Sequence, residues 1–438
     1  MHNKGILNKI DNLLKRLFPI YRSLTGEGNR ETLKILQEII PLEIKEFNSG
    51  DKVFDWVIPD EYEIKSAWIK NEKGNRIIDF NNSNLHVVSY STPVNKKMTF
   101  NELSKNLYYL DDIPDAIPYR TTYYSKDWGF CVNKKQFEIL SEQKGKLHVF
   151  IDSEFNPKGN MTYGEFLIPG KSEKEILLST YICHPSMAND NLSGFILTTL
   201  LADRLLENQS LRYSYRIIFV PETIGAIAYC AKNEKIMKNI DIGFILSTVG
   251  GPGKFGYKES WDANHRINKI INKVFIENNI DFVKYLFDPN GSDERQYSSP
   301  YFRINTPVIS KDKFYEYKYY HTSLDNLDFV KPQFIIQSLE LYSKVIDELE
   351  KEIIYKNIKN RCEVMLGRRN LYPSTGGSFL PDAENEINKL DIILWILNHC
   401  DGKSTLNDLE KKSNIKLEKL VEVSEELVEN NLLERIIS

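Results

Sequence analysis

Four residues with metal-binding or acid–base side chains stand at the ends of apolar runs in the middle of the chain. His184 closes the run EILLSTYIC, Asp190 precedes an apolar helical stretch, Glu222 follows YRIIFVP, and His321 lies in YYHTSLD. Zinc takes imidazole and carboxylate ligands, and a catalytic zinc commonly keeps three protein ligands and one open position. The two histidines and the aspartate supply that number. A nearby glutamate outside the ligand set can then act as general base toward water.

Each of these residues also has an ordinary structural interpretation. Asp190 can cap the helix that follows it, and Glu222 can complement the dipole of a first helical turn. His184 can be a turn residue, and His321 can be packed in a core. The sequence favours a common site because all four fall after predicted strands or in loops of one domain.

The elements around these residues alternate between short apolar runs and longer helical patterns. EILLSTYIC, YRIIFVP and IGFILSTVG read as strands, LSGFILTTLLADRLLEN reads as a helix, and a long helix is expected over residues 333–356. This alternation predicts an α/β fold with a mostly parallel mixed sheet sandwiched by helices. Loops converge at the carboxyl ends of such strands, so the four residues are expected to lie close together. The domain is expected to comprise residues 1–55 and 155–360.

Two further regions differ from this domain in composition and pattern. Residues 56–154 consist of short β-branched and aromatic runs between Pro, Asn, Asp and Gly, which predicts a small inserted β-rich domain. After the loop from Tyr372 to Gly377, residues 380–438 read as three helices and a terminal strand, which predicts a winged helix-turn-helix.

Charge limits the partners that this chain can be expected to bind. The segment 381–438 carries 7 basic and 13 acidic residues, and the whole chain has a net charge of −4. Phosphate contacts dominate nucleic-acid affinity, so no nucleic acid is expected despite the winged helix. A packing or dimerisation role is expected for it instead, which leaves a homo-oligomer open.

The remaining composition predicts a cytoplasmic globular protein. No signal-peptide pattern is seen, and no apolar run reaches the ~18 residues that a membrane span needs, so no membrane partner is expected. The 5 cysteines are odd in number and widely spaced, which fits a reducing compartment.

Several motifs together resemble a known family. CHPSMANDNLSG, FVPETIGA, ILSTVGG, GSDERQY and YHTSLDNLD resemble the successive motifs of zinc aminopeptidases with a phosphorylase/hydrolase-like fold, a group that includes glutaminyl cyclases. More narrowly, the whole chain, with its opening LFPIYRSLTGEGNRETL, resembles a bacterial aminopeptidase-like set with a nested β-rich domain and a C-terminal winged helix. The resemblance implies a zinc exopeptidase-like fold in which His184 and His321 bind zinc, Asp190 is the bridging aspartate and Glu222 is the general base.

Two positions depart from the pattern of the two-zinc members. In those members a second glutamate follows the base and an aspartate ends the strand LSTVG, whereas this sequence has Thr223 and Ser247. Hydroxyl groups are poor zinc ligands beside imidazole and carboxylate. The sequence therefore predicts one zinc ion held by His184, Asp190 and His321. An inactive site is the competing interpretation.

The residues do not decide which terminus of a substrate the site recognises. An exopeptidase recognises an amine by carboxylates or a carboxylate by arginine. The resemblance places Asp293 near the substrate. Further candidate contacts are Glu294, Asp325, Arg295, Arg120, Tyr320 and, from the inserted domain, Trp128 or Tyr124.

The reaction expected from these features is hydrolysis of a peptide or small amide substrate, with aminopeptidase activity favoured by the resemblance. Two alternatives remain open. One is an amidohydrolase acting on a sugar or amino-acid conjugate, and the other is a catalytically silent binding or regulatory protein.

Overall fold

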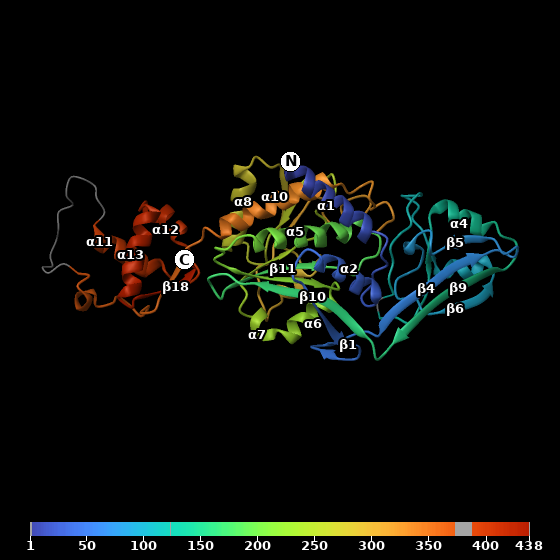
Figure 1. Cartoon of the computed structure of the whole chain (residues 1–438), viewed down its shortest axis with the longest axis horizontal. Helices are drawn as coiled ribbons and strands as arrows, with labels where there is room; N and C mark the ends of the chain where they lie inside the picture. The colour runs from blue at the N-terminus through green and yellow to red at the C-terminus, as the bar shows by residue number, and fades with distance from the viewer. Residues whose placement is uncertain (1, 123, 373–387, 438) are drawn as a thin grey trace. The chain divides into compact units, whose positions relative to one another are not determined.

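The structure is a computed structural model that describes residues 2–122, 124–372 and 388–437. The chain forms two compact units (Figure 1): residues 1–168, 175–209 and 215–345 make the first, and residues 169–174, 210–214 and 346–438 make the second. The linker expected from Tyr372 to Gly377 lies, after Tyr372, outside the described residues. None of the helices in the described part of the chain combines the length and apolarity that a bilayer-spanning segment needs.

An eight-stranded sheet forms the centre of the first unit. In spatial order its strands are β1 (Glu43–Asn48), β10 (Asn160–Ile168), β12 (Ser214–Val220), β11 (Glu175–Tyr181), β13 (Ile242–Ile245), β16 (Val308–Ser310), β14 (Phe255–Lys258) and β15 (Phe282–Tyr285). The pairs β11–β13, β13–β16 and β14–β15 are parallel, whereas β1–β10, β10–β12 and β14–β16 are antiparallel. The predicted mixed α/β sheet is confirmed.

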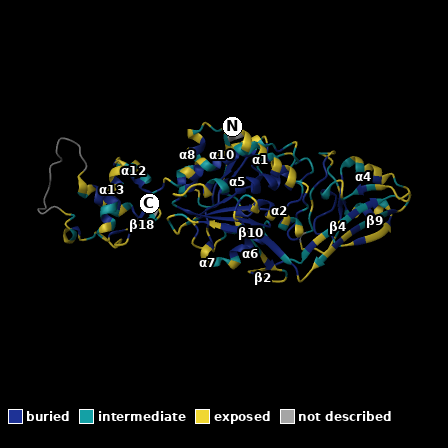
Figure 2. Ribbon diagram, viewed as in Figure 1, coloured by how far each residue is buried: buried dark blue, intermediate teal, exposed yellow. Residues whose placement is uncertain are grey.

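Helices cover both faces of this sheet (Figure 1). On one side lie α5 (Gly194–Leu206), α8 (Arg266–Glu277) and α10 (Pro332–Leu349), and on the other lie α6 (Ile224–Lys232) and α7 (Glu234–Met237). Helix α1 (His2–Leu17) packs against α5, α2 (Glu27–Gln37) packs against β1 and β10, and the short α9 (Glu294–Tyr297) packs against α6. Figure 2 shows the interior between these helices mostly in the colour of buried residues, and strand β12 is buried along its whole length.

The inserted region has a sheet and a core of its own. Strands β5 (Arg76–Asp79), β4 (Glu61–Lys70), β9 (Leu147–Asn156) and β6 (Val94–Met98) form an antiparallel sheet in that order. Its apolar side chains make a separate cluster with those of α4 (Lys134–Ser141). Smaller elements are the β2 (Lys52–Val53) and β3 (Trp56–Val57) hairpin, α3 (Phe100–Leu103), and the parallel pair β7 (Leu107–Tyr108) and β8 (Phe130–Cys131).

The second unit contains three packed helices and a two-stranded sheet. Helices α11 (Lys389–His399), α12 (Leu406–Ser413) and α13 (Leu417–Glu429) share one apolar cluster. Asn388 and Thr405 cap α11 and α12 by accepting backbone amide hydrogens, which explains where these helices begin.

Strand β18 (Leu433–Ile437) pairs antiparallel with β17 (Ile354–Asn357). The helix expected over residues 333–356 is therefore wrong beyond Leu349. Ile354 and Tyr355 are buried and form a strand beside β18, because this pairing satisfies their backbone groups while Tyr355 packs in the apolar cluster of the second unit.

Candidate metal centre

His184, Asp190 and His321 come together just beyond the carboxyl end of β11. Nε2 of His321 lies 2.9 Å from Oδ2 of Asp190, and Nε2 of His184 lies 4.0 Å from the same oxygen. One ligand atom from each residue fits within 4.8 Å of the other two. The side chain of His321 is 33% exposed, whereas those of His184 and Asp190 are 5% and 1% exposed. The cluster is therefore open only beside His321.

The buried atoms of this cluster fit a cation. Oδ2 of Asp190 and Nε2 of His321 have no hydrogen-bond partner among the described residues, although they lie 2.9 Å apart. A buried polar atom without a partner is costly, and such atoms are rare unless a ligand, ion or water satisfies them. Imidazole and carboxylate are also the donors that zinc prefers. The donor set therefore fits a zinc ion.

The surroundings hold the side chains of His184 and Asp190 in forms that bind metal. Burial lowers the pKa of His184 to about 4, so its imidazole is neutral near pH 7. Burial opposes ionisation of Asp190, but His184, His321 and the hydroxyl of Tyr181 outweigh it and hold the pKa of Asp190 at about 2. Metals bind the neutral imidazole and the ionised carboxylate, so little proton competition comes from these two groups.

The loop that carries Asp190 is fixed by Asp325. The Asp325 carboxylate accepts hydrogen bonds from the amides of Asn189 at 2.6 Å and Asp190 at 2.9 Å, and from the Tyr317 hydroxyl at 3.0 Å. The Tyr181 hydroxyl donates to Oδ1 of Asp190 at 2.5 Å, which leaves Oδ2 toward the histidines. Asp325 is fully buried. Its hydrogen bonds therefore fix residues 182–193, the metal loop, from the interior of the protein.

Arg22 fixes the loop from another direction. Its Nε donates to the carbonyl oxygen of His184 at 2.9 Å, and its Nη1 donates to that of Leu17 at 2.7 Å. The guanidinium is fully buried and lies over the ring of Phe195. The sequence alone assigns no role to Arg22. The available signal is that Arg22 is the single charge in the run LFPIYRSL.

Glu222 stands beside the ligand cluster without being one of its three members. Its Oε2 lies 3.8 Å from Nε2 of His184, and its Oε1 accepts a hydrogen bond from the Ser292 hydroxyl at 2.6 Å. Burial raises the pKa of Glu222 to about 7, and the negative charge of Asp190 acts in the same direction. A carboxyl group with a pKa near neutrality is suited to accept a proton and return it.

Cys183 belongs to a second set of metal-capable side chains, together with His184 and Glu222. Its Sγ accepts the amide hydrogen of Glu222 at 3.2 Å and lies 3.5 Å from Nδ1 of His184. Burial and the Glu222 carboxylate raise the pKa of the Cys183 thiol well above its usual range. Metals bind the thiolate, so this set is the poorer of the two.

Thr223 and Ser247, the two departures from the two-zinc pattern, bring no imidazole, thiolate or carboxylate to the site. The amide of Thr223 donates to Oδ1 of Asp293 at 2.7 Å, and the Ser247 side chain is fully buried. Both metal-capable sets that the described residues form contain His184. They therefore offer no independent set of donors for a second ion.

The predicted substrate contacts on α9 and before it have different environments. Asp293 and Glu294 are each 1% exposed, and Arg295 is exposed. Glu294 pairs with Nζ of Lys258 at 2.9 Å and accepts the amide hydrogen of Ser292 at 3.0 Å. The two carboxylates therefore brace the segment from which Ser292 reaches Glu222.

Aromatic rings from two regions surround His321. Tyr320 stacks on its imidazole with centroids 3.9 Å apart. From the inserted module, Tyr119 contacts both histidines, at 5.3 Å from His184 and 5.1 Å from His321. Trp128, which the sequence reasoning chose from this module, packs against the module's own apolar cluster. The ring of Tyr124 lies 5.5 Å from that of Trp56 at an interplanar angle of 57°. Sequence reasoning missed Tyr119.

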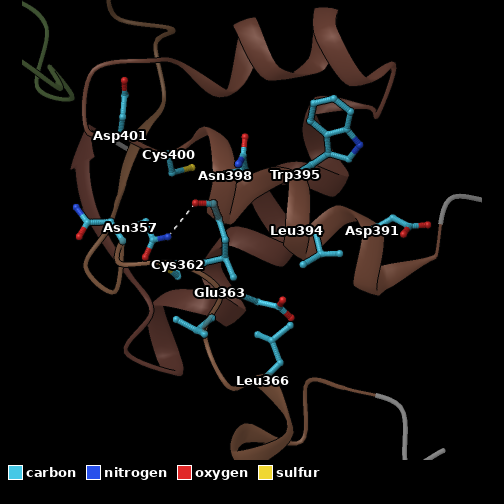
Figure 3. A pocket seen from close by; sticks show the side chains of 13 residues that line it. Asn357, Cys362, Glu363, Leu366, Asp391, Leu394, Trp395, Asn398, Cys400 and Asp401 are labelled. Carbon is cyan, nitrogen blue, oxygen red and sulfur yellow. Dashed lines mark hydrogen bonds between the residues drawn. The ribbon is translucent and has the colours of Figure 1, made fainter. Parts of the chain in front are cut away.

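A cavity of about 970 Å³ lies in the second unit (Figure 3). Asn357, on its wall, donates to the carbonyl oxygen of Leu397 at 2.8 Å, and Asp401 accepts the amide hydrogens of Lys403 and Ser404. These polar groups have internal partners. The histidine cluster is therefore the better candidate site.

Two family models match successive parts of the chain. Residues 11–352 match a family described as a domain of unknown function, DUF4910, and residues 353–435 match a winged helix-turn-helix family. A Clostridium acetobutylicum protein, named as a candidate polysaccharide biosynthesis protein with an aminopeptidase-like domain, is 42% identical over 430 residues. The match covers 98% of this chain and 96% of that protein. The predicted winged helix is confirmed.

Solved structures support the fold. The crystal structure of a candidate peptidase from Clostridium acetobutylicum has a TM-score of 0.78 at 40% identity, covering 99% of both chains. BSAP, a zinc aminopeptidase from Bacillus subtilis, has a TM-score of 0.59 at 14% identity, covering 82% of this chain and 96% of that chain. At that identity the likeness concerns the fold alone. The expected zinc exopeptidase-like fold is confirmed.

Proposed function

The chain belongs to the DUF4910 family, and on this premise we propose that it is a zinc-dependent exopeptidase of the aminopeptidase type. The observation that carries the proposal is the meeting of two unpartnered ligand atoms, Oδ2 of Asp190 and Nε2 of His321, beside Glu222. One zinc ion is held by His184, Asp190 and His321. The relative described as a candidate peptidase, at 40% identity over nearly the whole chain, supports an activity of this class.

In this proposal the protein's own groups manage the proton. When bound, zinc supplies Lewis acidity to the scissile carbonyl and to the attacking water. Oε2 of Glu222 accepts a proton from that water and returns it to the leaving amine. Ser292 holds Oε1, so that Oε2 stays directed toward His184. Burial raises the pKa of Glu222, which makes its carboxylate a stronger base than that of an exposed glutamate.

The choice of an aminopeptidase follows the relatives. The Clostridium acetobutylicum protein that is 42% identical over 430 residues is named for an aminopeptidase-like domain.

A second candidate is an amidohydrolase that acts on a sugar conjugate. The same centre would cleave any amide placed against it. What favours this candidate is the name of the Clostridium acetobutylicum relative, which connects that protein with polysaccharide biosynthesis. A panel of aminoacyl and N-acylated sugar substrates separates the two, because only the first group offers a free amine next to the scissile bond.

Glu222→Gln tests the proposed function. The variant is expected to retain about one zinc per chain but to lose turnover by roughly 100- to 10,000-fold, because a neutral amide cannot accept the proton of water. Metal content and initial rates are measured on the same preparations. Glu363→Gln, an exposed carboxyl change at the second-unit cavity, is the matched control and is expected to keep both values.

Two outcomes contradict the proposal. Equal rates in wild type and Glu222→Gln remove the role of Glu222 as base. Wild-type protein that is purified without chelator, carries no zinc and binds none when zinc is added instead supports a catalytically silent binding protein.

A further inference from the structure

A strap of the inserted module, residues 116–122, is hydrogen-bonded to the loop that carries His321. The amide of Tyr119 donates to the carbonyl oxygen of His321 at 2.7 Å. Ile117 donates its amide hydrogen to the Ser323 hydroxyl at 2.9 Å and accepts the Ser323 amide hydrogen at 2.8 Å. His321 itself has a φ of 54°, a left-handed conformation that costs a non-glycine residue about 1–2 kcal/mol. The strap therefore helps to hold a conformation that His321 would not adopt unaided.

The strap is equally fixed to the module from which it comes. Arg120 accepts the amide hydrogen of Ser89 at 2.9 Å, and Thr122 donates its own amide hydrogen to the carbonyl of Ser89 at 3.0 Å. Ile117 also packs in an apolar cluster with Met187, which belongs to the metal loop after β11. Hydrogen bonds and packing hold the strap both to its own module and to the loops that carry the histidines. The strap therefore has little freedom to move when a ligand binds.

The strap presents the ring of Tyr119 at the open side of the metal cluster. This ring meets the imidazole of His321 edge-on, at an interplanar angle of 88°, while Tyr320 stacks on the same imidazole at 14°. The ring of His184 lies 5.3 Å from that of Tyr119. Since His321 is the exposed member of the cluster, a ligand that approaches the metal position passes the rings that flank it.

We propose that Tyr119 limits the size of the side chain that the site accepts next to the scissile bond. The inserted module is then a specificity element of the active site, and the preferred substrates are aminoacyl compounds whose first residue is small. This inference rests on the proposed function, because it presumes a zinc centre that receives an amine-bearing substrate. A rigidly held ring rejects a larger group because neither the ring nor the group can move aside without losing contacts.

Amino acid hydroxamates are the probe for this inference. They chelate zinc through the hydroxamate and place an amino acid side chain beside it. Calorimetry on zinc-loaded protein compares the alanine and phenylalanine hydroxamates. Tyr119→Ala is expected to shift the ratio of their affinities toward phenylalanine by about tenfold or more, because the space of the phenol ring becomes available. Tyr119→Phe is expected to keep the wild-type ratio.

Two further variants make the test robust. Tyr119→Trp is expected to move the ratio in the opposite direction, and it also serves if Tyr119→Ala does not fold. Tyr108→Ala, at a partly exposed tyrosine of the same module, is the matched control and is expected to leave the ratio unchanged.

The outcomes separate this inference from the proposed function. Wild-type protein that binds zinc but neither hydroxamate contradicts the proposed function, and the inference falls with it. If wild type binds both probes and the ratio is the same in the alanine, tryptophan and wild-type proteins, the inference is overturned while the proposed function stands. A weaker affinity for zinc with an unchanged ratio would make Tyr119 a positioning residue only, which also overturns the inference.

Discussion

The metal cluster of the first unit and the cavity of the second unit differ in whether their polar atoms have hydrogen-bond partners. The cluster is nearly closed, yet Oδ2 of Asp190 and Nε2 of His321 have no hydrogen-bond partner among the described residues. The cavity offers about 970 Å³, yet Asn357 and Asp401 on its wall are satisfied by backbone groups of their own unit.

Under the proposed function, unsatisfied buried atoms mark the active site, whereas the larger free volume does not. A buried donor or acceptor without a partner costs about 1–3 kcal/mol, so a stable fold retains one where something else satisfies it. A hollow lined by satisfied groups carries no such cost. The metal loop is also held by long-range hydrogen bonds, which Arg22 donates and Asp325 accepts, whereas the helices of the second unit share one apolar cluster and have local caps.

The strongest test of this comparison is His321→Ala, for which we expect the largest loss of zinc affinity. Removing one of three ligands is expected to weaken zinc binding by more than the roughly 10- to 100-fold that follows loss of an outer-shell partner. Competition with a chromophoric chelator measures the affinity. His399→Ala, a histidine of the second unit whose Nε2 contacts the carbonyl of Thr405, is the control and is expected to leave zinc binding unchanged. Equal affinities in the two variants would refute the ligand assignment.

A smaller effect is expected from Asp325→Asn. The carboxylate accepts hydrogen bonds from two amides and one hydroxyl, and an amide side chain would turn its own NH₂ donors toward some of these donors. We expect zinc affinity to fall roughly 10- to 100-fold and the metal-free protein to lose about 1–3 kcal/mol of unfolding free energy. Urea denaturation after chelation measures the second quantity. Unaltered stability and affinity would mean that Asp325 does not position the metal loop.

The smallest effect is expected in the pH dependence of kcat/KM. Glu222 must be ionised to accept a proton, so kcat/KM is expected to fall as pH decreases through the pKa of Glu222, and the charge of a bound zinc ion moves that pKa below about 7. The Ser292 hydroxyl lowers this pKa by donating to Oε1, so Ser292→Ala is expected to move the acid limb toward higher pH.

The variant should be affected mainly on the acidic side. A hydrogen bond to a charged group contributes about 1.5 kcal/mol, which corresponds to a rate roughly tenfold lower on the acid limb and little changed above it. Zinc content is expected to stay the same. A profile that drops equally at all pH values would show that Ser292 does not act through the proton affinity of Glu222.

Much of the fold followed from local patterns. The strands that lead to His184 and Glu222 were predicted because continuous apolar runs are typical of buried strands, and both runs are strands in the structure. The rule that loops meet at the carboxyl ends of parallel strands then predicted that these residues lie close together. Where local and long-range preferences disagreed, as for Ile354 and Tyr355, pairing with β18 decided the outcome.

The residues that hold the site in shape were not predicted. The sequence predicts Asp325 as a substrate contact, Trp128 as a ring at the site and no role for Arg22. The structure instead has Asp325 and Arg22 bonded to the metal loop and Tyr119 beside the histidines. Arg22 and His184 are 162 residues apart in the chain, and Asp325 and Asn189 are 136 residues apart. No local pattern reports such a contact.

The sequence by itself determined which donors the chain offers to a metal, where Thr223 and Ser247 withhold two of them, and which segments become strands and helices. These are properties of side-chain chemistry and of apolar periodicity, which a short window of residues contains. Only the tertiary structure decided which oxygen of Asp190 stays free, that Asp325 and Arg22 secure the metal loop, and that the ring beside the histidines is Tyr119. Those outcomes depend on how distant segments pack, because a hydrogen bond forms only where folding brings its donor and acceptor within about 3 Å.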